Sequence, residues 1–455
     1  MLLTYTSQAG RYEFVKDGQY SDSTANTFSI IVGKNGTGKS RLLRAVVLAL
    51  FGGEIREELV DPRDRAELRQ LAFELDTTRA PTQVICVATS PFDRFPLLRR
   101  SQNIPGYTYL GMRGLSSANQ SLAYLSKIAN TLVDSVLSDE RQAGAIAGVL
   151  TYLGYEPSIR LSWQPLSQRL IDDLTQADDL HHATHELIRR GPPMFPNEVA
   201  SNYQRIIDTP PHKLRQALEL ARNLRIEKFS RFVELRLSQD GFATDGYYGI
   251  NLEEIFLLVN TGLLRLRQVE LCKSGSNEGF LISHASSGEQ AVVLSLLGIG
   301  SQIRDGSLVC IDEPEVCLHP EWQEKYIQLL YSTFQHFTGC HFVIATHSPQ
   351  IVAHLPEGNC HIMSMETGLA IDASSFSRKS IDFQLAEVFG APGVRNEYLS
   401  RIALNLFASV SKVRRFDADA RKTLQSLEKV LDLLQKDDPV YDLIMALKEM
   451  HKNYA

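Results

Sequence analysis

The sequence predicts an α/β fold with a mostly parallel sheet, because short apolar runs of strand type alternate with helical patterns. Three runs carry this prediction, at residues 28–32, 83–89 and 307–311. Each is short, apolar and rich in β-branched residues, as expected for strands buried on both faces. A fourth run of the same kind lies at 342–346. Residues 2–15 alternate weakly and predict additional antiparallel strands at the N-terminus.

A glycine-rich loop of the form G-x-x-x-x-G-K-[ST] follows the first run, and a helical pattern then extends from Ser40 to Leu50. This order predicts a phosphate-binding loop, because backbone N–H groups converge on phosphate at the positive end of a helix. Lys39 is expected to reach the phosphates of a nucleoside triphosphate, and the Ser40 hydroxyl to ligate Mg²⁺. A simple glycine-rich turn would not explain both flanks. The predicted nucleotide-binding residues are Gly33, Asn35, Gly36, Thr37, Gly38, Lys39, Ser40 and Arg41.

Composition limits the class of protein. The chain has 455 residues, a net charge of −6 and six scattered cysteines without a C-x-x-C pair. These features predict a chain of several domains with free thiols and a cytoplasmic location. No apolar run approaches the roughly 20 residues of a membrane span, so no membrane partner is expected. The acidic balance gives no overall footprint for nucleic acid, although folding could still gather a local basic groove.

Changes in composition along the chain predict four regions. Leucine-rich helical stretches separated by proline-rich breaks indicate a helical insert, and an amphipathic pattern indicates a helical C-terminal region. The predicted regions are a first lobe at 1–115, the helical insert at 116–241, a second lobe at 242–375 and the helical C-terminal region at 376–455. Residues 57–75 are charged and predict a helix within the first lobe. No sustained heptad predicts a coiled-coil arm.

Three further motifs follow in order. The run S-S-G-E-Q at 286–290 opens an apolar helix, where Ser287 is the expected helix cap and the exposed N–H groups offer an anion site. The strand at 307–311 ends in Asp312 and Glu313. Asp312 is placed to hold Mg²⁺ through water, and Glu313 to act as general base on the attacking water. His347 follows the fourth strand and is expected to sense or polarise the γ-phosphate.

The order of these motifs resembles the ABC-type ATPase superfamily. The run DEPEVCLHP at 312–320 is similar to the soluble branch that includes the SMC and RecF-like proteins and the AAA_21 ATPases, and differs from transporter subunits. The resemblance covers 1–115 and 245–365. It implies ATP and Mg²⁺ as cofactors and a head-to-tail dimer, with larger assemblies left open. In that dimer Ser287, Gly288 and Glu289 would face the nucleotide held by the phosphate-binding loop of a second copy.

The sequence departs from the family at one expected position. The family places a glutamine that contacts Mg²⁺ at the end of the strand that here ends near Thr89. Either Ser90 or Asp93 replaces that glutamine, or the contact is absent. The family also implies an aromatic residue that stacks on adenine, for which the candidates are Tyr5, Tyr12 and Phe14.

Two other patterns favour structural roles. His181 and His185 have a spacing that could bind zinc, but no cysteine is near, so a solvated helix face is the better interpretation. Asp417 and Asp419 imitate a nuclease D-x-D pair, yet a helical pattern follows them, so one of them is expected to cap that helix. The chain shows no nuclease motif of its own.

These features favour an ATP-driven switch that controls a separate effector in bacterial anti-phage defence. The pattern around 385–390 resembles the ATPase of Septu-type systems, including those attached to retrons, which implies an HNH nuclease as partner. A PARIS-type ATPase that holds a toxin is the near alternative. A RecF- or SMC-like clamp in DNA repair, with nucleic acid as partner, is the alternative from another class. The C-terminal helices either cap the ATPase or dock a partner.

Overall fold

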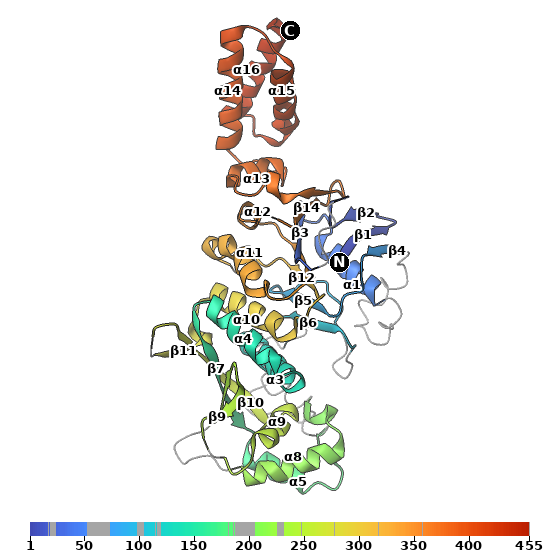
Figure 1. Cartoon of the computed structure of the whole chain (residues 1–455), viewed down its shortest axis with the longest axis vertical. Helices are drawn as coiled ribbons and strands as arrows, with labels where there is room; N and C mark the ends of the chain where they lie inside the picture. Colours follow the sequence, from blue (N-terminus) through green and yellow to red (C-terminus); the bar gives the residue numbers. More distant parts are fainter. Residues whose placement is uncertain are drawn as a thin grey trace.

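The structure is a computed structural model that describes the whole chain except residues 17, 19–23, 52–72, 98–103, 114, 116–119, 181, 185, 187–204, 225–231, 247, 277, 317, 357 and 455. Its described strands form three sheets, and the α/β class predicted from the sequence is confirmed. Figure 1 shows an elongated molecule, with the central sheet in the middle, an antiparallel sheet with helices at one end and a helical unit at the other.

The central sheet has seven strands, of which neighbours pair in parallel except for the edge strand β15. The four apolar runs noted in the sequence form its middle. In order across the sheet the strands are β15 (Ala370–Asp372), β14 (Cys360–Ser364), β3 (Thr27–Val32), β13 (His341–Ala345), β12 (Leu308–Asp312), β5 (Val84–Ala88) and β6 (Tyr107–Gly111). Asp312 pairs with Ala345 on one side and with Ala88 on the other, so these strands end together at one edge.

Helices cover both faces of this sheet because each buried strand sends alternate side chains to opposite sides. One face packs against α1 (Lys39–Leu50), and a small antiparallel sheet lies beside it. The other face packs against α10 (Ser287–Gln302) and the helices around it. The small sheet consists of β2 (Gly10–Glu13), β1 (Leu2–Ser7) and β4 (Phe73–Thr77). On the opposite face of the central sheet, the helices around α10 include α3 (Gln120–Ser138), α4 (Arg141–Tyr152) and α11 (Pro320–Phe334).

The expected helical insert at 116–241 contains helices but also strands. This region contributes two strands and the first residue of a third to a five-stranded antiparallel sheet, ordered β11 (Gly279–Leu281), β10 (Leu264–Lys273), β7 (Tyr155–Pro165), β8 (Val233–Ser238) and β9 (Gly241–Thr244). In β8 the buried residues Val233, Leu235 and Leu237 alternate with period two. Leucines at such positions also fit a helical pattern, and a helix, α8 (Pro211–Asn223), does precede them in the chain. Further helices near this sheet in the sequence include α5 (Gln168–Thr175) and α9 (Leu252–Asn260).

Two other sequence expectations concern the first lobe. Most of the predicted charged helix at 57–75 lies outside the described residues. Its last residues, from Phe73, belong instead to strand β4, which pairs with β1. The N-terminal antiparallel strands are present as predicted.

The C-terminal region is helical, as predicted. It begins with α13 (Ile381–Glu387) and continues as a three-helix unit with its own hydrophobic core, separate from the cores of the central sheet. The helices of this unit are α14 (Glu397–Val413), α15 (Ala418–Val430) and α16 (Pro439–Tyr454). Figure 1 shows the unit projecting at the end of the molecule opposite β9 and α8. Asp417 caps α15 by accepting the N–H of Ala420 at 2.8 Å, so it is the cap among the two candidates, Asp417 and Asp419.

The described part of the chain contains no helix long and apolar enough to cross a membrane. Within that part Cys86, Cys272, Cys310, Cys340 and Cys360 are free thiols, in agreement with the sequence expectation.

His341 joins the N-terminal sheet to the central sheet. Its Nδ1 accepts the N–H of Leu2 at 3.1 Å, and its Nε2 lies 2.8 Å from the hydroxyl oxygen of Ser29, which itself donates to the carbonyl of Phe14. These bonds fit the neutral ring protonated on Nε2. Burial is the main cause that lowers the pKa of His341 to about 3.

This geometry predicts an acid-sensitive junction. The pKa of His341 is lower in the folded chain than its ordinary value of 6.5, so the unfolded state binds the additional proton. His341 therefore leaves the stability intact above pH 6.5 and reduces it as the pH falls from 6.5 toward 3, by about 1.4 kcal/mol for each unit of pKa difference. Chemical unfolding of wild type and His341→Gln at several pH values measures this. The variant should be less stable at pH 7.5, and the difference between the two proteins should shrink on acidification. A constant difference would contradict the assignment.

Candidate functional site

The phosphate-binding loop lies between β3 and α1, at the edge where the central strands end. Gly38 precedes α1 with a φ of 98°, a left-handed conformation that glycine adopts without strain. A Cβ on Gly33 would lie 2.9 Å from the Thr37 hydroxyl, so the loop is too tight for a side chain there. Thr37 closes the turn by donating to the carbonyl of Lys34 at 2.9 Å. The glycines thus shape a loop whose N–H groups at the start of α1 can face an anion.

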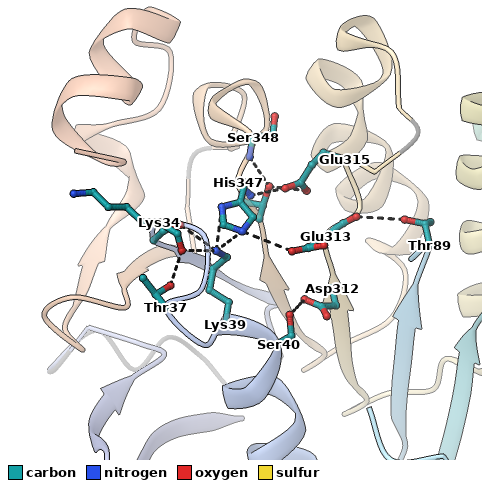
Figure 2. A network of polar contacts seen from close by, with 12 residues as sticks. Lys34, Thr37, Lys39, Ser40, Thr89, Asp312, Glu313, Glu315, His347 and Ser348 are labelled. Atoms are coloured by element: carbon teal, nitrogen blue, oxygen red, sulfur yellow. Dashed lines mark hydrogen bonds and ion pairs between the residues drawn. The ribbon is translucent and has the colours of Figure 1, made fainter. Parts of the chain in front are cut away.

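Lys39 points into this loop and is only 4% exposed. Its Nζ donates to the carbonyl of Gly33 at 3.0 Å and lies 2.5 Å from Nε2 of His347, as Figure 2 shows. Burial lowers the pKa of Lys39, and the surrounding carboxylates oppose that effect. The hydrogen-bond partners described for the Lys39 ammonium are therefore neutral groups. A phosphate group could take their place and form a stronger, charged hydrogen bond.

Ser40 and Asp312 meet although 272 residues separate them in the sequence. The Ser40 hydroxyl donates to Oδ1 of Asp312 at 3.0 Å (Figure 2). Burial is the largest cause that raises the pKa of Asp312 to about 7, and the bond from Ser40 opposes it. A hydroxyl and a carboxylate oxygen are ligands that Mg²⁺ prefers, so this pair fits the cation that the sequence motifs imply.

Glu313 extends the strand end toward His347. Its φ of 48° is left-handed, which is uncommon for a residue other than glycine. The Glu313 N–H donates to the carbonyl of Ala345 at 2.9 Å, and the Thr89 hydroxyl donates to the Glu313 carbonyl at 3.3 Å. Neighbouring strand ends thus fix the strained backbone from both sides. The carboxylate is one third exposed, with Oε1 3.6 Å from Nε2 of His347.

Glu315 is a site residue that the sequence analysis missed. Its carboxylate accepts the Thr346 hydroxyl at 2.9 Å and the backbone N–H of His347. Glu315 therefore ties the loop after β12 to the loop that carries His347. Burial, and then the charge of Lys39, lower the pKa of His347 to about 4, so its ring is neutral near pH 7. The second glutamate of the DEPE run was the available signal, but it served only as a family marker.

The first turn of α10 differs from the expectation in its cap. Ser286, not Ser287, caps the helix by accepting the N–H of Glu289 at 3.2 Å. The side chain of Gln290 donates to the carbonyl of Ala285 at 2.9 Å. The Glu289 carboxylate, predicted to face the nucleotide, accepts the hydroxyl of Tyr155 at 2.7 Å. Ser287 is left exposed, and its hydroxyl has no hydrogen-bond partner in the described part of the chain.

Ser90 and Asp93 are the two candidates to replace the glutamine that contacts Mg²⁺ in the family. Asp93 is buried, and its carboxylate accepts the hydroxyl of Tyr109 at 2.5 Å and the N–H of Phe95 at 3.1 Å. Ser90 accepts the N–H of Phe92 at 3.2 Å. Among the described contacts neither candidate is bonded to the Ser40–Asp312 pair.

The three candidate aromatic residues for adenine stacking differ in burial. Phe14 and Tyr5 are buried in the core, at 0% and 2% exposure, whereas Tyr12 is partly exposed. Of the three, only Tyr12 therefore presents surface to a ligand.

His181 and His185, whose spacing could bind zinc but favours a solvated helix face, lie outside the described residues. Within the described ranges no group of three or more histidine, cysteine, aspartate or glutamate side chains could hold a metal ion.

Comparison with known proteins finds a match to an AAA domain family in part of the chain. Residues 131–353 match the family described as "AAA domain, putative AbiEii toxin, Type IV TA system". The match includes Ser286 to Gln290, Asp312, Glu313 and His347, while the phosphate-binding loop precedes it. No curated protein matches the chain.

Several solved structures are weakly similar. Stu0660 of Streptococcus thermophilus is 12% identical, with 80% of this chain and 74% of that chain covered and a TM-score of 0.30. An SMC head bound to the C-winged helix domain of ScpA is 12% identical, with 81% and 96% covered and a TM-score of 0.27. The Smc head from Pyrococcus furiosus bound to the C-terminal domain of ScpA is 13% identical, with 81% and 94% covered and a TM-score of 0.28. With TM-scores this low, the fold class rests on the chain's own sheets.

The role of Glu315 can be tested by Glu315→Gln. The amide keeps one acceptor but turns a donor toward Thr346 or His347, so the variant should lose about 1–3 kcal/mol of stability. ATP hydrolysis should fall about tenfold, because His347 is no longer held. Glu321→Gln is the matched control, since Glu321 is exposed and pairs with Lys325 on the surface of α11. Equal hydrolysis rates in the Glu315 variant and the control would show that Glu315 does not position the site.

Proposed function

We propose that this chain is an ATP-binding and ATP-hydrolysing switch that controls a separate effector nuclease in bacterial anti-phage defence. The observation that carries the proposal is the convergence of Lys39, Ser40, Asp312, Glu313 and His347 at one edge of the central sheet. The family match supports the ATPase, and the toxin–antitoxin wording of its description is compatible with a defence role.

The residues of the site have distinct tasks in hydrolysis. Lys39 leaves the loop carbonyls and binds the β- and γ-phosphates. Ser40 and Asp312 hold Mg²⁺, which supplies positive charge beside the phosphate oxygens when it is bound. Glu313 accepts a proton from a water molecule as the water oxygen bonds to the γ-phosphorus. The bond from that phosphorus to the bridging oxygen breaks, and ADP and inorganic phosphate result. His347 orients the water or the γ-phosphate.

A second copy of the chain completes the site. Ser287 is exposed, and Gly288 lies beside it at the start of α10, while the other residues of that turn are held within their own chain. Ser287 presents a free hydroxyl and, although Gly288 is buried, the N–H groups of this turn suit the γ-phosphate bound by a second copy in a head-to-tail dimer. ATP binding closes this dimer, and hydrolysis by Glu313 opens it. The effector responds to the state that prevails.

The effector is a separate nuclease of the HNH type. Its docking surface lies on the three-helix unit of α14, α15 and α16, which has its own core and stands apart from the catalytic edge (Figure 1). Leu404 and Phe407 of α14 are exposed there, at 55% and 36%. Exposed apolar residues on a rigid helix are typical anchors of a protein interface.

A DNA-binding clamp of RecF or SMC type is the second candidate. It is favoured by a basic cluster at the outer end of the three-helix unit, where α14 meets α15. The exposed cations of this cluster are Lys412, Arg414, Arg415, Arg421 and Lys422. They outnumber the nearby Asp417 and Asp419, and such a cluster binds the phosphate backbone with a strong salt dependence.

The ATPase assignment is tested with Glu313→Gln and Lys39→Ala. Glu313→Gln should bind ATP normally, hydrolyse it at least about 100-fold more slowly and accumulate as a dimer, because only the proton acceptor is lost. Lys39→Ala should lose ATP binding. Equilibrium binding, phosphate release and light scattering measure these effects.

Lys34→Ala is the matched control for the lysine variant. Lys34 lies on the same loop but its side chain is half-exposed and reaches toward Glu366 at 4.0 Å. Hydrolysis at the wild-type rate by Glu313→Gln would show that another group is the base. Equal affinity of Lys39→Ala and Lys34→Ala for ATP would remove the phosphate-binding assignment.

The partner is tested by expressing tagged wild type and Glu313→Gln with their neighbouring genes. We expect a nuclease at a constant ratio to the ATPase, captured differently by the two proteins because they favour different dimer states. Leu404→Asp should release the nuclease without changing ATP hydrolysis. Capture of DNA with no protein partner, enriched in Glu313→Gln, would favour the clamp instead.

A further inference from the structure

We propose that Tyr155 is a positioning residue that couples the antiparallel sheet to the first turn of α10, and so sets the orientation of Ser287 and Gly288 toward the nucleotide of a second copy. This inference rests on the proposed function, because it assigns a control element to the same composite site.

The coupling consists of one hydrogen bond between two segments distant in the sequence. The Tyr155 hydroxyl donates to Oε1 of Glu289 at 2.7 Å. Tyr155 is 4% exposed, and its ring packs against the ring of Phe280 with centroids 5.8 Å apart. Burial, together with the Glu289 carboxylate, raises the pKa of Tyr155, so the hydroxyl remains a donor at every ordinary pH. A part-buried hydrogen bond to a carboxylate is stronger than a typical neutral one.

Tyr155 is anchored on the sheet side. It begins β7, the middle strand of the five, and pairs with Lys273 of β10. The residues around it are held as well, since the carbonyl of Gly154 accepts the N–H of Ser274 at 2.9 Å. A displacement of β7 relative to the central sheet therefore moves the Tyr155 hydroxyl.

The chain supplies a second connection between the same two parts. Strand β11 leads directly through the short helix η3 (Ile282–His284) to Ser286, the cap of α10. Phe280 of β11 is the residue that packs on Tyr155. The first turn of α10 is thus held from two sides of one sheet, by the covalent path through β11 and by Tyr155 through Glu289.

The consequence concerns Ser287 and Gly288. The side chains of their neighbours Ser286, Glu289 and Gln290 each form a hydrogen bond that fixes the turn. Ser287 and Gly288 take part in none of these three hydrogen bonds. The direction in which the turn presents its free donors therefore depends on the sheet. A macromolecule that binds the antiparallel sheet would change hydrolysis by this route without touching Lys39 or Glu313.

The test is Tyr155→Phe in the full-length chain, which removes the hydroxyl and keeps the packed ring. We expect kcat for ATP hydrolysis to fall roughly tenfold and ATP-dependent dimerisation to weaken by a similar factor, the size of one charged hydrogen bond. The affinity of the undimerised chain for ATP should remain unchanged, because Lys39 and its loop are not involved.

Tyr152→Phe is the matched control. Tyr152 lies three residues earlier, at the end of α4, and its hydroxyl contacts Gln335 and His336 away from α10. It should retain the wild-type kcat. Glu289→Gln, which keeps an acceptor for the Tyr155 hydroxyl, should lose less activity than Tyr155→Phe, and the double variant should be no slower than Tyr155→Phe alone.

Several results would overturn the inference. A wild-type kcat in Tyr155→Phe would do so, as would a loss of ATP affinity in the undimerised chain or additive losses in the double variant. Thermal unfolding of each variant identifies a loss that comes from misfolding, which would count against a positioning role. Glu313→Gln in the same assay separates the two hypotheses. If it is inactive while Tyr155→Phe is normal, the ATPase stands and the coupling fails.

Discussion

The common register of the parallel strands determines where every candidate reacting group lies. Asp312 pairs with Ala345 and Ala88, and Ala345 pairs in turn with Ile31 of β3. The residues that follow these strand ends therefore emerge side by side, although the sequence separates them widely. A shift of one strand by one residue would send its side chains to the other face of the sheet. The buried apolar cores on both faces prevent such a shift. The packing that fixes the register of the strands therefore also fixes the geometry of the site.

Charged groups of both signs are concentrated at the same edge. Asp312, Glu313 and Glu315 lie near a single buried lysine, and the ring of His347 is neutral because burial and Lys39 lower its pKa. Burial raises the pKa of Asp312 and of Glu315 and lowers that of Lys39, so each charged form is disfavoured on its own. Hydrogen bonds from Ser40, Thr346 and the His347 backbone offset part of this cost. A phosphate on Lys39 and a divalent cation beside Ser40 are the charges that complement the arrangement.

The sequence predicts those parts of the fold in which the local hydrophobic pattern and the residue types point to the same structure. The four buried strands and the loop before α1 fall in this class, because short β-branched runs and a glycine–lysine–serine motif have few alternative structures. The antiparallel sheet was missed because its strands are half polar and its buried residues, such as Leu235 and Leu237, also occur in helices. The cap of α10 was assigned one residue late, since adjacent serines are equivalent in sequence and only backbone geometry distinguishes them. Glu315 and Tyr155 were missed because their partners come from distant segments.

The path from the catalytic edge to the C-terminal unit follows from packing alone. His347 is followed by Ser348, which caps the short helix α12 (Pro349–Ala353) by accepting the N–H of Ile351 at 3.3 Å. Helix α12 packs on α13, and α13 packs on α14. The N–H of Arg378 donates to the carbonyl of Ala353 at 2.8 Å, which fixes the segment between α12 and α13. Glu315 therefore lies at the start of a continuous chain of packed elements, since it holds the backbone of His347. A change at the γ-phosphate of a bound nucleotide that displaces His347 would therefore have a continuous packed route to α14, the first helix of the three-helix unit.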